Sequence, residues 1–597
     1  RISMKALFLF ILFTLPLIGQ INPFSDQSLR LGLSPTYYGG HGVSIIDYNR
    51  DGWDDIFISN MSQFFQSDTS YCTLLKNNQN GTFTNVTVSA GLRIYGSFKS
   101  GIFGDINNDG YPDLFLGEAL GNGRCHLLLN NKDGTFKDLG NECGIIFTSM
   151  VATAAFGDYD NDGRLDLFLA TEYPDFDILY RNTSSGDTIS FTDVSSFAGI
   201  EGFTSTAAMQ STFIDIDHDG DQDIYAVHDG FLPSSLFRNN GNGSFTDISI
   251  ASGLYDYGIG NSMGLYWKDF DCDGWEEVYV TRIGKGGLYK RQPNGKYTNI
   301  ADSSGAEFNG MTWGIVWEDL DNDMDDDMFL VNTYGYNGTK SIYYENKNGK
   351  YTDMASAYGL NFPHAFYGLA YGDFNNDGYL DLVAAATDGF NKLLLNTRNK
   401  SGNWIKLSLE GTSVNRMAVG VTVRAVTGSK IQRRTVTAGN SYASQMAPWL
   451  HFGLDTLTQI DTLQIIWSTT KTQTFTNVTA NKHYRLLEGN TLLTPVSEHR
   501  IPFVPRSSAL EQNYPNPFNP STTISYAVGT EGLSSGIHVS LKVFDLLGKE
   551  IATIVDEYQK QGNYSVQFNS GGLPSGLYLY RLNAGSYTAV KKMILMK

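Results

Sequence analysis

The sequence has few cysteines and none of the common catalytic motifs. Its 597 residues include four cysteines, with no CxxC pair and no cysteine–histidine spacing typical of zinc sites. Nine histidines are scattered along the chain, which also lacks HExxH, GxSxG, P-loop and dinucleotide-binding motifs. These absences exclude the usual zinc modules and leave no recognisable catalytic centre, so we expect a protein that is not an enzyme.

Long hydrophobic runs are almost absent. The longest, from Ala6 to Ile18, has 13 residues, whereas a membrane-spanning helix needs about 20. The run follows Met4 and Lys5 and ends before Gly19, which predicts a secretory signal peptide over residues 1–20. We therefore expect export through the periplasm to the medium or the outer-membrane surface, with no transmembrane segment.

Positive charge is scarce, because the formal net charge is −19. This balance argues against nucleic acid as a partner. In an oxidising compartment Cys125 and Cys143, which flank one predicted hairpin, would either form a disulfide or remain as small buried residues. Both alternatives stay open at this point.

One nine-residue acidic loop occurs seven times. The copies are Asp47–Asp55, Asp105–Asp113, Asp158–Asp166, Asp215–Asp223, Asp269–Glu277, Asp319–Asp327 and Asp373–Asp381. Carboxylates or amides at positions 1, 3 and 5, with an acid at position 9, would repel one another without a shared cation. Calcium, which takes six to eight oxygen ligands, suits this set best. We predict up to seven structural Ca²⁺ ions.

Four residues in each loop are candidate metal ligands. They are Asp47, Asn49, Asp51 and Asp55; Asp105, Asn107, Asp109 and Asp113; Asp158, Asp160, Asp162 and Asp166; Asp215, Asp217, Asp219 and Asp223; Asp269, Asp271, Asp273 and Glu277; Asp319, Asp321, Asp323 and Asp327; and Asp373, Asn375, Asp377 and Asp381. An EF-hand would need a glutamate at position 12 between two helices. Here position 12 is always apolar and lies in a strand pattern, so the EF-hand is rejected.

The spacing of the loops predicts the architecture. Successive loops start 50 to 58 residues apart, and each unit carries short β-rich runs and Asn-Gly turns. About four strands per unit, repeated seven times, predict an all-β, seven-bladed β-propeller over residues 21–398. The outer Phe-Thr-Asp type of run is missing after the seventh loop, but Phe24–Asp26 supplies one at the other end. We infer that this N-terminal strand completes the last blade.

These units resemble the FG-GAP or VCBS repeats of integrin-α-type propellers. The resemblance covers roughly Phe24 to Asn396. It implies side-chain ligands from positions 1, 3, 5 and 9 and a backbone carbonyl ligand from position 7. Met324 departs from the pattern at position 6, where the other loops have glycine, and is strained if that position needs a positive φ. We interpret His218, at position 4 of loop four, as solvent-facing.

A different β pattern starts near Trp404. Alternating runs such as Trp404–Leu409, together with Gly439–Tyr442 and Phe452–Gly453, resemble the ASPIC and UnbV domain, and we place this small β domain at residues 399–490. The family's usual Trp-Pro-Ser-Gly turn reads Trp467-Ser-Thr-Thr here. The resemblance implies no particular biochemical role.

A linker over residues 491–511 precedes a last module, residues 512–597. It opens with Asn513-Tyr-Pro-Asn-Pro-Phe-Asn-Pro and continues in alternating strands, which predict an immunoglobulin-like β-sandwich. It resembles the C-terminal sorting domain of type IX secretion cargo. That resemblance implies recognition by the type IX secretion machinery.

Two function classes remain. The first is a secreted or cell-surface, calcium-stabilised binding protein for a protein or glycan ligand. The alternative is a secreted, lyase-like polysaccharide-processing enzyme, which needs base and cation residues converging on one propeller face. Tryptophans near the loops suit interblade packing or a sugar-binding face. They are Trp53, Trp267, Trp275, Trp313 and Trp317.

Overall fold

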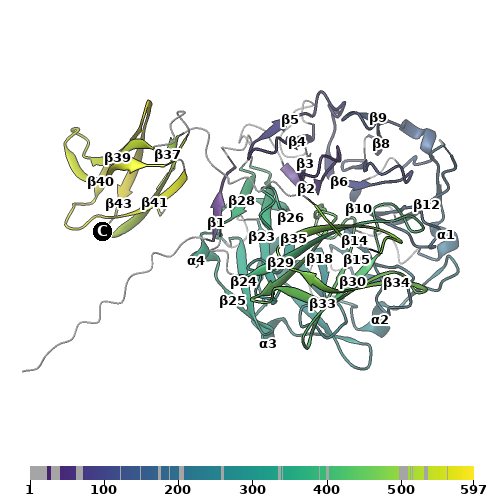
Figure 1. The fold of residues 1–597 in the computed structure, drawn as a ribbon. Coiled ribbons are helices and arrows are strands. Elements are labelled where there is room, and N and C mark those ends of the chain that lie inside the picture. The colour runs from purple at the N-terminus through teal and green to yellow at the C-terminus, as the bar shows by residue number, and fades with distance from the viewer. Residues whose placement is uncertain are drawn as a thin grey trace, which may run out of the picture. The chain divides into compact units, whose positions relative to one another are not determined.

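The computed structural model forms two compact units, the second of which consists mainly of residues 499–597 (Figure 1). Each unit is described by itself. The structure describes residues 23–28, 40–61, 71–121, 123–147, 150–172, 176–186, 188–200, 207–230, 232–256, 261–333, 338, 340–388, 390–397, 402–491, 493–496, 508–510, 512–513, 515–529, 536–560 and 562–596. The predicted signal peptide lies outside these ranges.

The first unit opens with seven antiparallel groups of four strands, each an acidic-loop repeat. The groups are β2 (Gly40–Ile46), β3 (Asp55–Asn60), β4 (Thr73–Asn77) and β5 (Phe83–Asn85); β6 (Phe98–Gly104), β7 (Asp113–Glu118), β8 (His126–Asn130) and β9 (Phe136–Asp138); β10 (Val151–Gly157), β11 (Asp166–Thr171), β12 (Ile178–Asn182) and β13 (Phe191–Asp193); β14 (Ala208–Ile214), β15 (Asp223–His228), β16 (Ser235–Asn239) and β17 (Phe245–Asp247); β18 (Asn261–Lys268), β19 (Glu277–Lys285), β20 (Gly287–Arg291) and β21 (Tyr297–Asn299); β22 (Asn309–Glu318), β23 (Asp327–Asn332), β24 (Ile342–Lys347) and β25 (Lys350–Asp353); and β26 (Phe366–Gly372), β27 (Asp381–Ala386), β28 (Lys392–Asn396) and β1 (Phe24–Asp26). The predicted all-β propeller class is confirmed.

The ring closes through the N-terminal strand. β1 pairs antiparallel with β28, and Phe24 lies opposite Asn396. The first strand of each blade packs against the first strand of the next, and β26 packs against β2. The N-terminal strand thus gives the last blade four strands, like the other blades. Blades five and six are further joined, because Ile283 to Lys285 of β19 pair with Asn309 to Met311 of β22.

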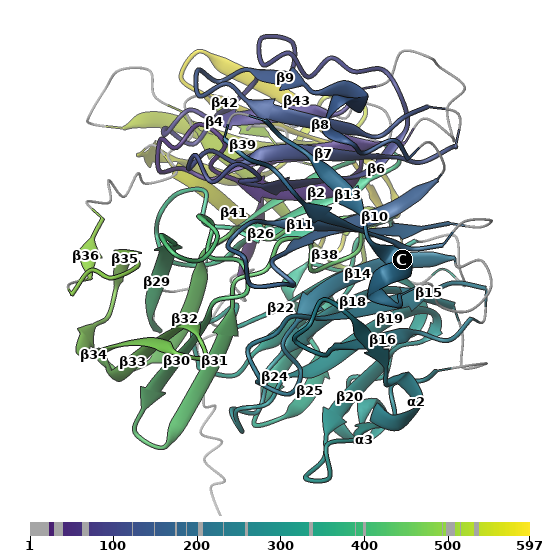
Figure 2. The same ribbon diagram turned by 90° about the vertical axis from the view of Figure 1, so that its right-hand side faces the viewer.

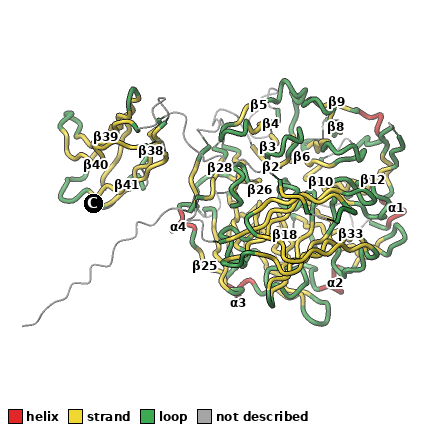
Figure 3. The backbone as a smooth tube through the Cα atoms, in the orientation of Figure 1, coloured by secondary structure: helices red, strands yellow, loops and turns green. Residues whose placement is uncertain are grey.

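Short helical turns follow the outer strands of five blades, and strands dominate elsewhere (Figure 3). They are the 3-10 turn η2 (Gly140–Cys143), α1 (Ser195–Ala198), α2 (Ser249–Ser252), α3 (Ala301–Ser304) and α4 (Ala355–Tyr358). The acid or amide that ends the strand starts the helix, as where Asp193 Oδ1 accepts the Ser195 N–H at 3.0 Å. A left-handed glycine ends each turn; Gly253, with φ of 82°, is one of these.

The second domain consists of two four-stranded sheets, shown beside the propeller in Figure 2. One contains β32 (Leu450–Asp455), β29 (Asn403–Glu410), β35 (Lys482–Leu487) and β36 (Thr494–Pro495), and the other β31 (Lys430–Thr435), β30 (Thr422–Thr427), β33 (Gln459–Ser468) and β34 (Lys471–Thr479). One apolar cluster runs from Phe115 and Phe156 of the propeller to Ile405 and Leu463 of this domain. The two domains therefore share a core.

The second unit is a two-sheet sandwich. Its sheets are β37 (Ala509–Leu510), β38 (Ser521–Val528) and β41 (Gly562–Asn569), and β40 (Glu550–Gln559), β39 (Ile537–Phe544), β42 (Gly576–Ala584) and β43 (Tyr587–Leu595). Alternate residues such as Leu541, Tyr580 and Met593 point inward and are fully buried. Period-two alternation in the sequence thus produces one buried face in each long strand.

Candidate calcium loops and the domain that covers them

The first aspartate of each loop accepts hydrogen bonds from main-chain N–H groups later in the same loop. Asp105 Oδ1 accepts the Asp109 N–H at 2.9 Å, and Asp105 Oδ2 accepts the Gly110 N–H at 2.7 Å. The second of these bonds recurs in all seven loops. The bonds span only four or five residues, so the local sequence is sufficient to build the turn.

The acid at position 9 ties the loop to its blade. Asp113 is fully buried; Oδ1 accepts the Asn130 N–H at 2.8 Å, and Oδ2 accepts the Ile106 N–H at 3.1 Å. The Asn130 amide then donates to the Tyr48 carbonyl of the preceding loop at 2.9 Å. An asparagine N–H binds the position-9 acid in six blades: Asn77, Asn130, Asn182, Asn239, Asn346 and Asn396. The amide reaches the preceding loop from five of them, all except Asn346. Arg291 takes its place in blade five.

Sequence reasoning missed this asparagine. It ends the apolar run of the third strand in six blades, as in Leu179-Tyr-Arg-Asn182, so its recurrence at one repeat position was the available signal. Its interblade bond joins residues about 80 positions apart, as from Asn130 to Tyr48, and no local pattern reveals such a partner.

The loop oxygens converge as a cation site requires. Four loops bring three carboxylate oxygens within 4.8 Å of one another: Asp158, Asp160 and Asp166; Asp215, Asp217 and Asp223; Asp269, Asp271 and Asp273; and Asp319, Asp321 and Asp323. Buried oxygens of Asp55, Asp160 and Asp269 have no hydrogen-bond donor. Close, buried and unsatisfied carboxylate oxygens match the hard-oxygen preference of calcium. The residues present therefore fit the ion, with the individual ligand assignments remaining predictions.

Burial and mutual repulsion disfavour ionisation of these carboxyl groups in the ion-free protein. Burial raises the pKa of Asp47 to about 7, that of Asp158 to about 7 and that of Asp223 to about 8. Neighbouring aspartates add to the rise, as Asp162 does at Asp158. A bound cation would reverse this balance by stabilising the charged form.

Position 6 adopts a left-handed backbone in every loop. The glycines there have φ from 81° to 93°, and Met324 has φ of 73°. The conformation expected for Met324 is thus present, and it is one that a side chain with a Cβ adopts only at a cost.

Position 4 links neighbouring loops. The amides of Asn108, Asn161 and Asn322 donate to the position-6 carbonyl of the next loop, at 2.7, 3.3 and 3.5 Å. The interpretation of His218 as solvent-facing is wrong. Its ring stacks on Trp275 of loop five at 4.1 Å, and Nε2 lies 2.9 Å from Glu276 Oε2.

The second domain covers the loop face of the propeller. Polar contacts reach it from loops one, two, five, six and seven: Arg50–Glu410 at 3.4 Å, Asn108–Arg416 at 2.8 Å, Glu276–Arg433 at 2.6 Å, Asp326–Arg434 at 2.8 Å and Asp373–Lys406 at 3.5 Å. In loops three and four, Gly163 and Gly220 lie against Ser413 and Thr469. All seven loops therefore touch this domain.

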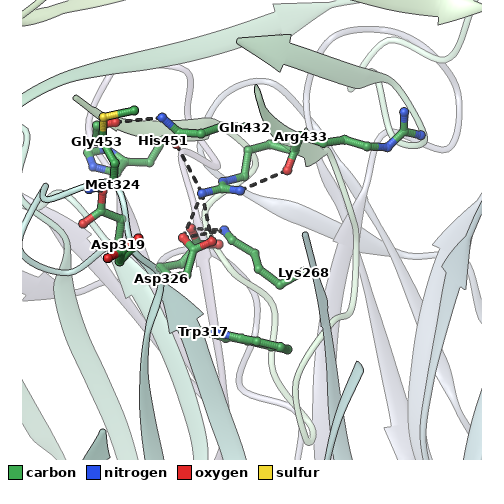
Figure 4. Close-up of polar contacts among 12 residues, drawn as sticks. Lys268, Trp317, Asp319, Met324, Asp326, Gln432, Arg433, His451 and Gly453 are labelled. Atoms are coloured by element: carbon green, nitrogen blue, oxygen red, sulfur yellow. Dashed lines mark hydrogen bonds and ion pairs between the residues drawn. The ribbon is translucent and has the colours of Figure 1, made fainter. Parts of the chain in front are cut away.

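Loop six and its neighbours meet the second domain in a cluster of polar contacts (Figure 4). Asp326, 2% exposed, pairs with Arg434, and Lys268 pairs with Glu318 beside it. His451 Nε2 lies 2.6 Å from Asn322 Oδ1. A Cβ at Gly453 would lie 1.8 Å from Asp319 Oδ2, so only glycine fits there. Isolated charges are costly to bury, and here each has a partner from the other domain or from a neighbouring blade.

A segment between β31 and β32 fills the propeller axis. Ser441, Ser444 and Gln445 are fully buried. Gln445 forms a bridge with Ser44 of β2, and the Ser441 hydroxyl accepts the Ile315 N–H of β22 at 3.0 Å. The segment also bonds to β6, β10, β14 and β26. It therefore lies at the axis, among the first strands of the blades.

Two of the cysteines and one of the tryptophans discussed above are buried and contribute to packing. Cys125 and Cys143 are free, buried thiols in one apolar cluster. Trp317 is fully buried and packs on Phe270 of the preceding loop at 5.4 Å between ring centroids. Interblade packing is therefore the observed use of Trp317.

Family models match three regions of the chain. FG-GAP-like repeat matches residues 47–116, 105–169, 158–226, 215–280 and 319–384, together half of the chain. ASPIC and UnbV matches residues 411–492, and Secretion system C-terminal sorting domain matches residues 512–596. The sorting domain indicates export to the cell surface or the medium. Within the described ranges, no helix has the length and apolar character needed to span a membrane.

Individual relatives share less of the sequence. Cartilage acidic protein 1 of Mus musculus is 22% identical over 427 residues, 69% of this chain and 59% of that protein. Integrin alpha-6 of Homo sapiens is 36% identical over 95 residues, 14% of this chain and 8% of that protein. A solved Agrocybe aegerita lectin that recognises non-reducing terminal N-acetylglucosamine has 15% identity, covers 61% of this chain and 88% of its own, and has a TM-score of 0.34.

The chain spans three fifths or less of the length of the curated relatives it matches. Repeats, loop geometry and the family matches nevertheless agree at all seven acidic loops. The chain therefore belongs to the FG-GAP-like repeat family, and it carries an ASPIC and UnbV domain and a secretion-system sorting domain after its repeats.

Proposed function

We propose that the chain is an exported, calcium-stabilised binding protein that presents one propeller face to a protein or glycan ligand. The observation that carries the proposal is that the second domain covers the loop face of the propeller. The second domain contacts all seven loops, and its axial segment around Gln445 bonds to the first strands of the blades. A ligand then meets the face on which the loops do not lie.

Exposed aromatic side chains on that opposite face support the proposal. Tyr95 is 49% exposed, Phe176 46%, Tyr255 39% and Phe390 47%. Each lies shortly before a first or third strand of a blade, and those strands start at the face opposite the loops. Arg93 lies over the rings of Tyr71 and Tyr95, at 5.6 and 5.4 Å. Aromatic and arginine side chains are enriched where proteins bind partners.

The proposed role of calcium is structural. Bound ions would neutralise the loop carboxylates and hold each loop in the shape that the second domain covers. Because the ions bind the folded loops, their binding free energy adds to the free energy of unfolding. Type IX export would deliver the chain to a compartment where such ions are plentiful.

We also propose that the chain is not an enzyme. A polysaccharide-processing site would need accessible base and cation side chains. His41 and Lys99, which lie together in the propeller, are 2% and 7% exposed. Burial lowers the pKa of His41 to about 3 and leaves the ring neutral. Product release from a panel of acidic and neutral polysaccharides would contradict this proposal.

The binding proposal is tested with the calcium-loaded mature chain in two ways. The chain is applied to a glycan array, and it is used to capture binding partners from a mixture of extracellular proteins. We expect Tyr95→Ala and Phe390→Ala to weaken binding to the strongest hit at least tenfold. Phe197→Ala is the matched control, because Phe197 is 75% exposed on α1 at the outer edge. Unchanged binding by both face variants would exclude this face as the ligand site.

A further inference from the structure

The terminal strand of the sorting domain has an occupied edge. β43 pairs with β42 on one side. On the other side, the Phe518 N–H donates to the Ile594 carbonyl at 2.9 Å, and the Phe518 carbonyl accepts the Met596 N–H at 3.0 Å. Asn516 Oδ1 accepts the Ile594 N–H at 2.8 Å. A partner cannot add a strand along this half of β43 without displacing the Asn516–Phe518 segment.

The outer face of the same sheet carries a partly exposed apolar patch. In the strand register, Leu577 of β42 lies opposite Ile594 of β43, and Leu579 lies opposite Phe544 of β39. Their alternation with buried Tyr578 and Tyr580 places all four on the face away from the core. Ile594 is 41% exposed.

A tight turn extends this patch. It follows Phe544, and its Leu546 and Leu547 are 63% and 95% exposed. Asp545 Oδ1 accepts the Leu547 and Lys549 N–H groups at 3.0 and 2.9 Å. The turn is thus held by its own aspartate while it presents two leucines to solvent. Because the backbone of the turn is already ordered, binding there costs less backbone conformational entropy.

Cations border the patch. Lys592 lies opposite Leu579, and Arg581 lies 4.7 Å above the Phe544 ring. Lys542 lies opposite Arg581 and forms an ion pair with Glu550 at 3.1 Å. The face therefore combines an apolar centre with a mainly basic border, a composition typical of a protein-docking surface.

We propose that this outer face, defined by Phe544, Leu547, Leu577, Leu579 and Ile594, is the surface by which the secretion machinery recognises the chain. The partner is a protein receptor whose apolar groove is bordered by carboxylates. Recognition uses side chains of the sheet face, since Asn516–Phe518 occupy the terminal edge. The inference rests on the proposed export through the sorting domain. The experiment below tests that export separately from the docking surface.

The test is made on the full chain in a bacterium that carries this secretion system. Leu547→Ser and the double variant Lys592→Glu with Arg581→Glu change exposed or bordering side chains and leave the core intact. We expect each to reduce the surface-plus-medium fraction at least fivefold and to raise the periplasmic fraction. Leu457→Ser, 41% exposed in the second domain, is the matched control.

Folding and export are separated by two further measurements. Protease resistance of the sorting domain in periplasmic extracts must match that of the unaltered chain. A chain that lacks Leu577–Lys597 tests export through this domain as such. If that deletion blocks export while both face variants are exported within twofold of the unaltered chain, the docking surface is wrong. If the deletion is also exported normally, export through the sorting domain is wrong.

Discussion

Gln445 of the second domain bonds both main-chain groups of Phe103 in the propeller. Gln445 Oε1 accepts the Phe103 N–H at 2.7 Å, and Nε2 donates to the Phe103 carbonyl at 3.1 Å. Both residues are fully buried, although 342 positions separate them. The side chain thus replaces a strand partner for β6 inside the ring.

Replacing Gln445 should destabilise the whole first unit. Gln445→Ala leaves two buried main-chain groups unsatisfied, each costing about 1–3 kcal/mol, so we expect a loss of at least about 2 kcal/mol. Chemical denaturation of the calcium-loaded chain measures it. Gln459→Ala, an exposed glutamine of the same domain, should change the free energy of unfolding by less than about 0.5 kcal/mol. Equal effects at both positions would argue against an axial role.

Calcium removal should lower the melting temperature, and more strongly at higher pH. In the ion-free protein, burial raises the pKa of Asp105 to about 6 and that of Asp47 to about 7. The folded ion-free state therefore holds protons that the unfolded chain releases, and it loses stability as the pH rises from about 4 to about 7. Calcium needs the deprotonated ligands, so its stabilisation grows over the same range.

Thermal melts with calcium and with EDTA, at pH values from about 5 to about 8, measure this difference. We expect the gap between the two melting temperatures to widen steadily as the pH rises. Magnesium in place of calcium is the control. Calcium is the larger of the two ions and suits a flexible oxygen site with many ligands better than magnesium does. A melting temperature that ignores the chelator at every pH would refute the structural role of calcium.

Met324→Gly should stabilise loop six. The φ of 73° at Met324 costs a residue with a Cβ about 1–2 kcal/mol, which glycine avoids. We expect a gain of about 1 kcal/mol and tighter calcium binding at this loop, measured by denaturation and calorimetry. At Met354, where φ is −113°, the same change should give no gain. A loss of stability in Met324→Gly would show that the methionine side chain is needed there.

Arg434→Ala should loosen the second domain from the loop face. Its partner Asp326, on loop six, would be left as a buried, less compensated charge, which costs about 3–5 kcal/mol. Limited proteolysis should then cut between β31 and β32 earlier than in the unaltered chain. Arg424→Ala, on the neighbouring strand β30, keeps the loop contacts and serves as the control. Identical cleavage of all three chains would contradict the proposed closure.

Deleting Leu577–Lys597 should trap the chain in the periplasm. The deletion removes β42 and β43, which contribute Tyr580, Leu582 and Met593 to the core of the sorting domain. Cell fractionation measures the location, and the chain is detected in each fraction through an epitope in its propeller. A truncated chain found at the surface or in the medium would contradict the sorting role.

The sequence by itself determined the repeat, the acidic loops and the ring. Asp105 bonds residues four and five positions ahead, and the Phe-Thr-Asp type of run caps the helical turn that follows it. Interactions of this range leave a visible pattern, because partner and spacing recur in every blade. The closing strand Phe24–Asp26 was predictable for the same reason, since one expected run was missing elsewhere.

Only the tertiary structure decided which propeller face is covered and what fills its axis. Arg434 meets Asp326, and Gln445 meets Phe103, across 108 and 342 residues, and neither pair is repeated. A single long-range contact depends on how two finished domains fit together, in shape and in charge. Such a contact occurs once, so it produces no periodic pattern in the sequence.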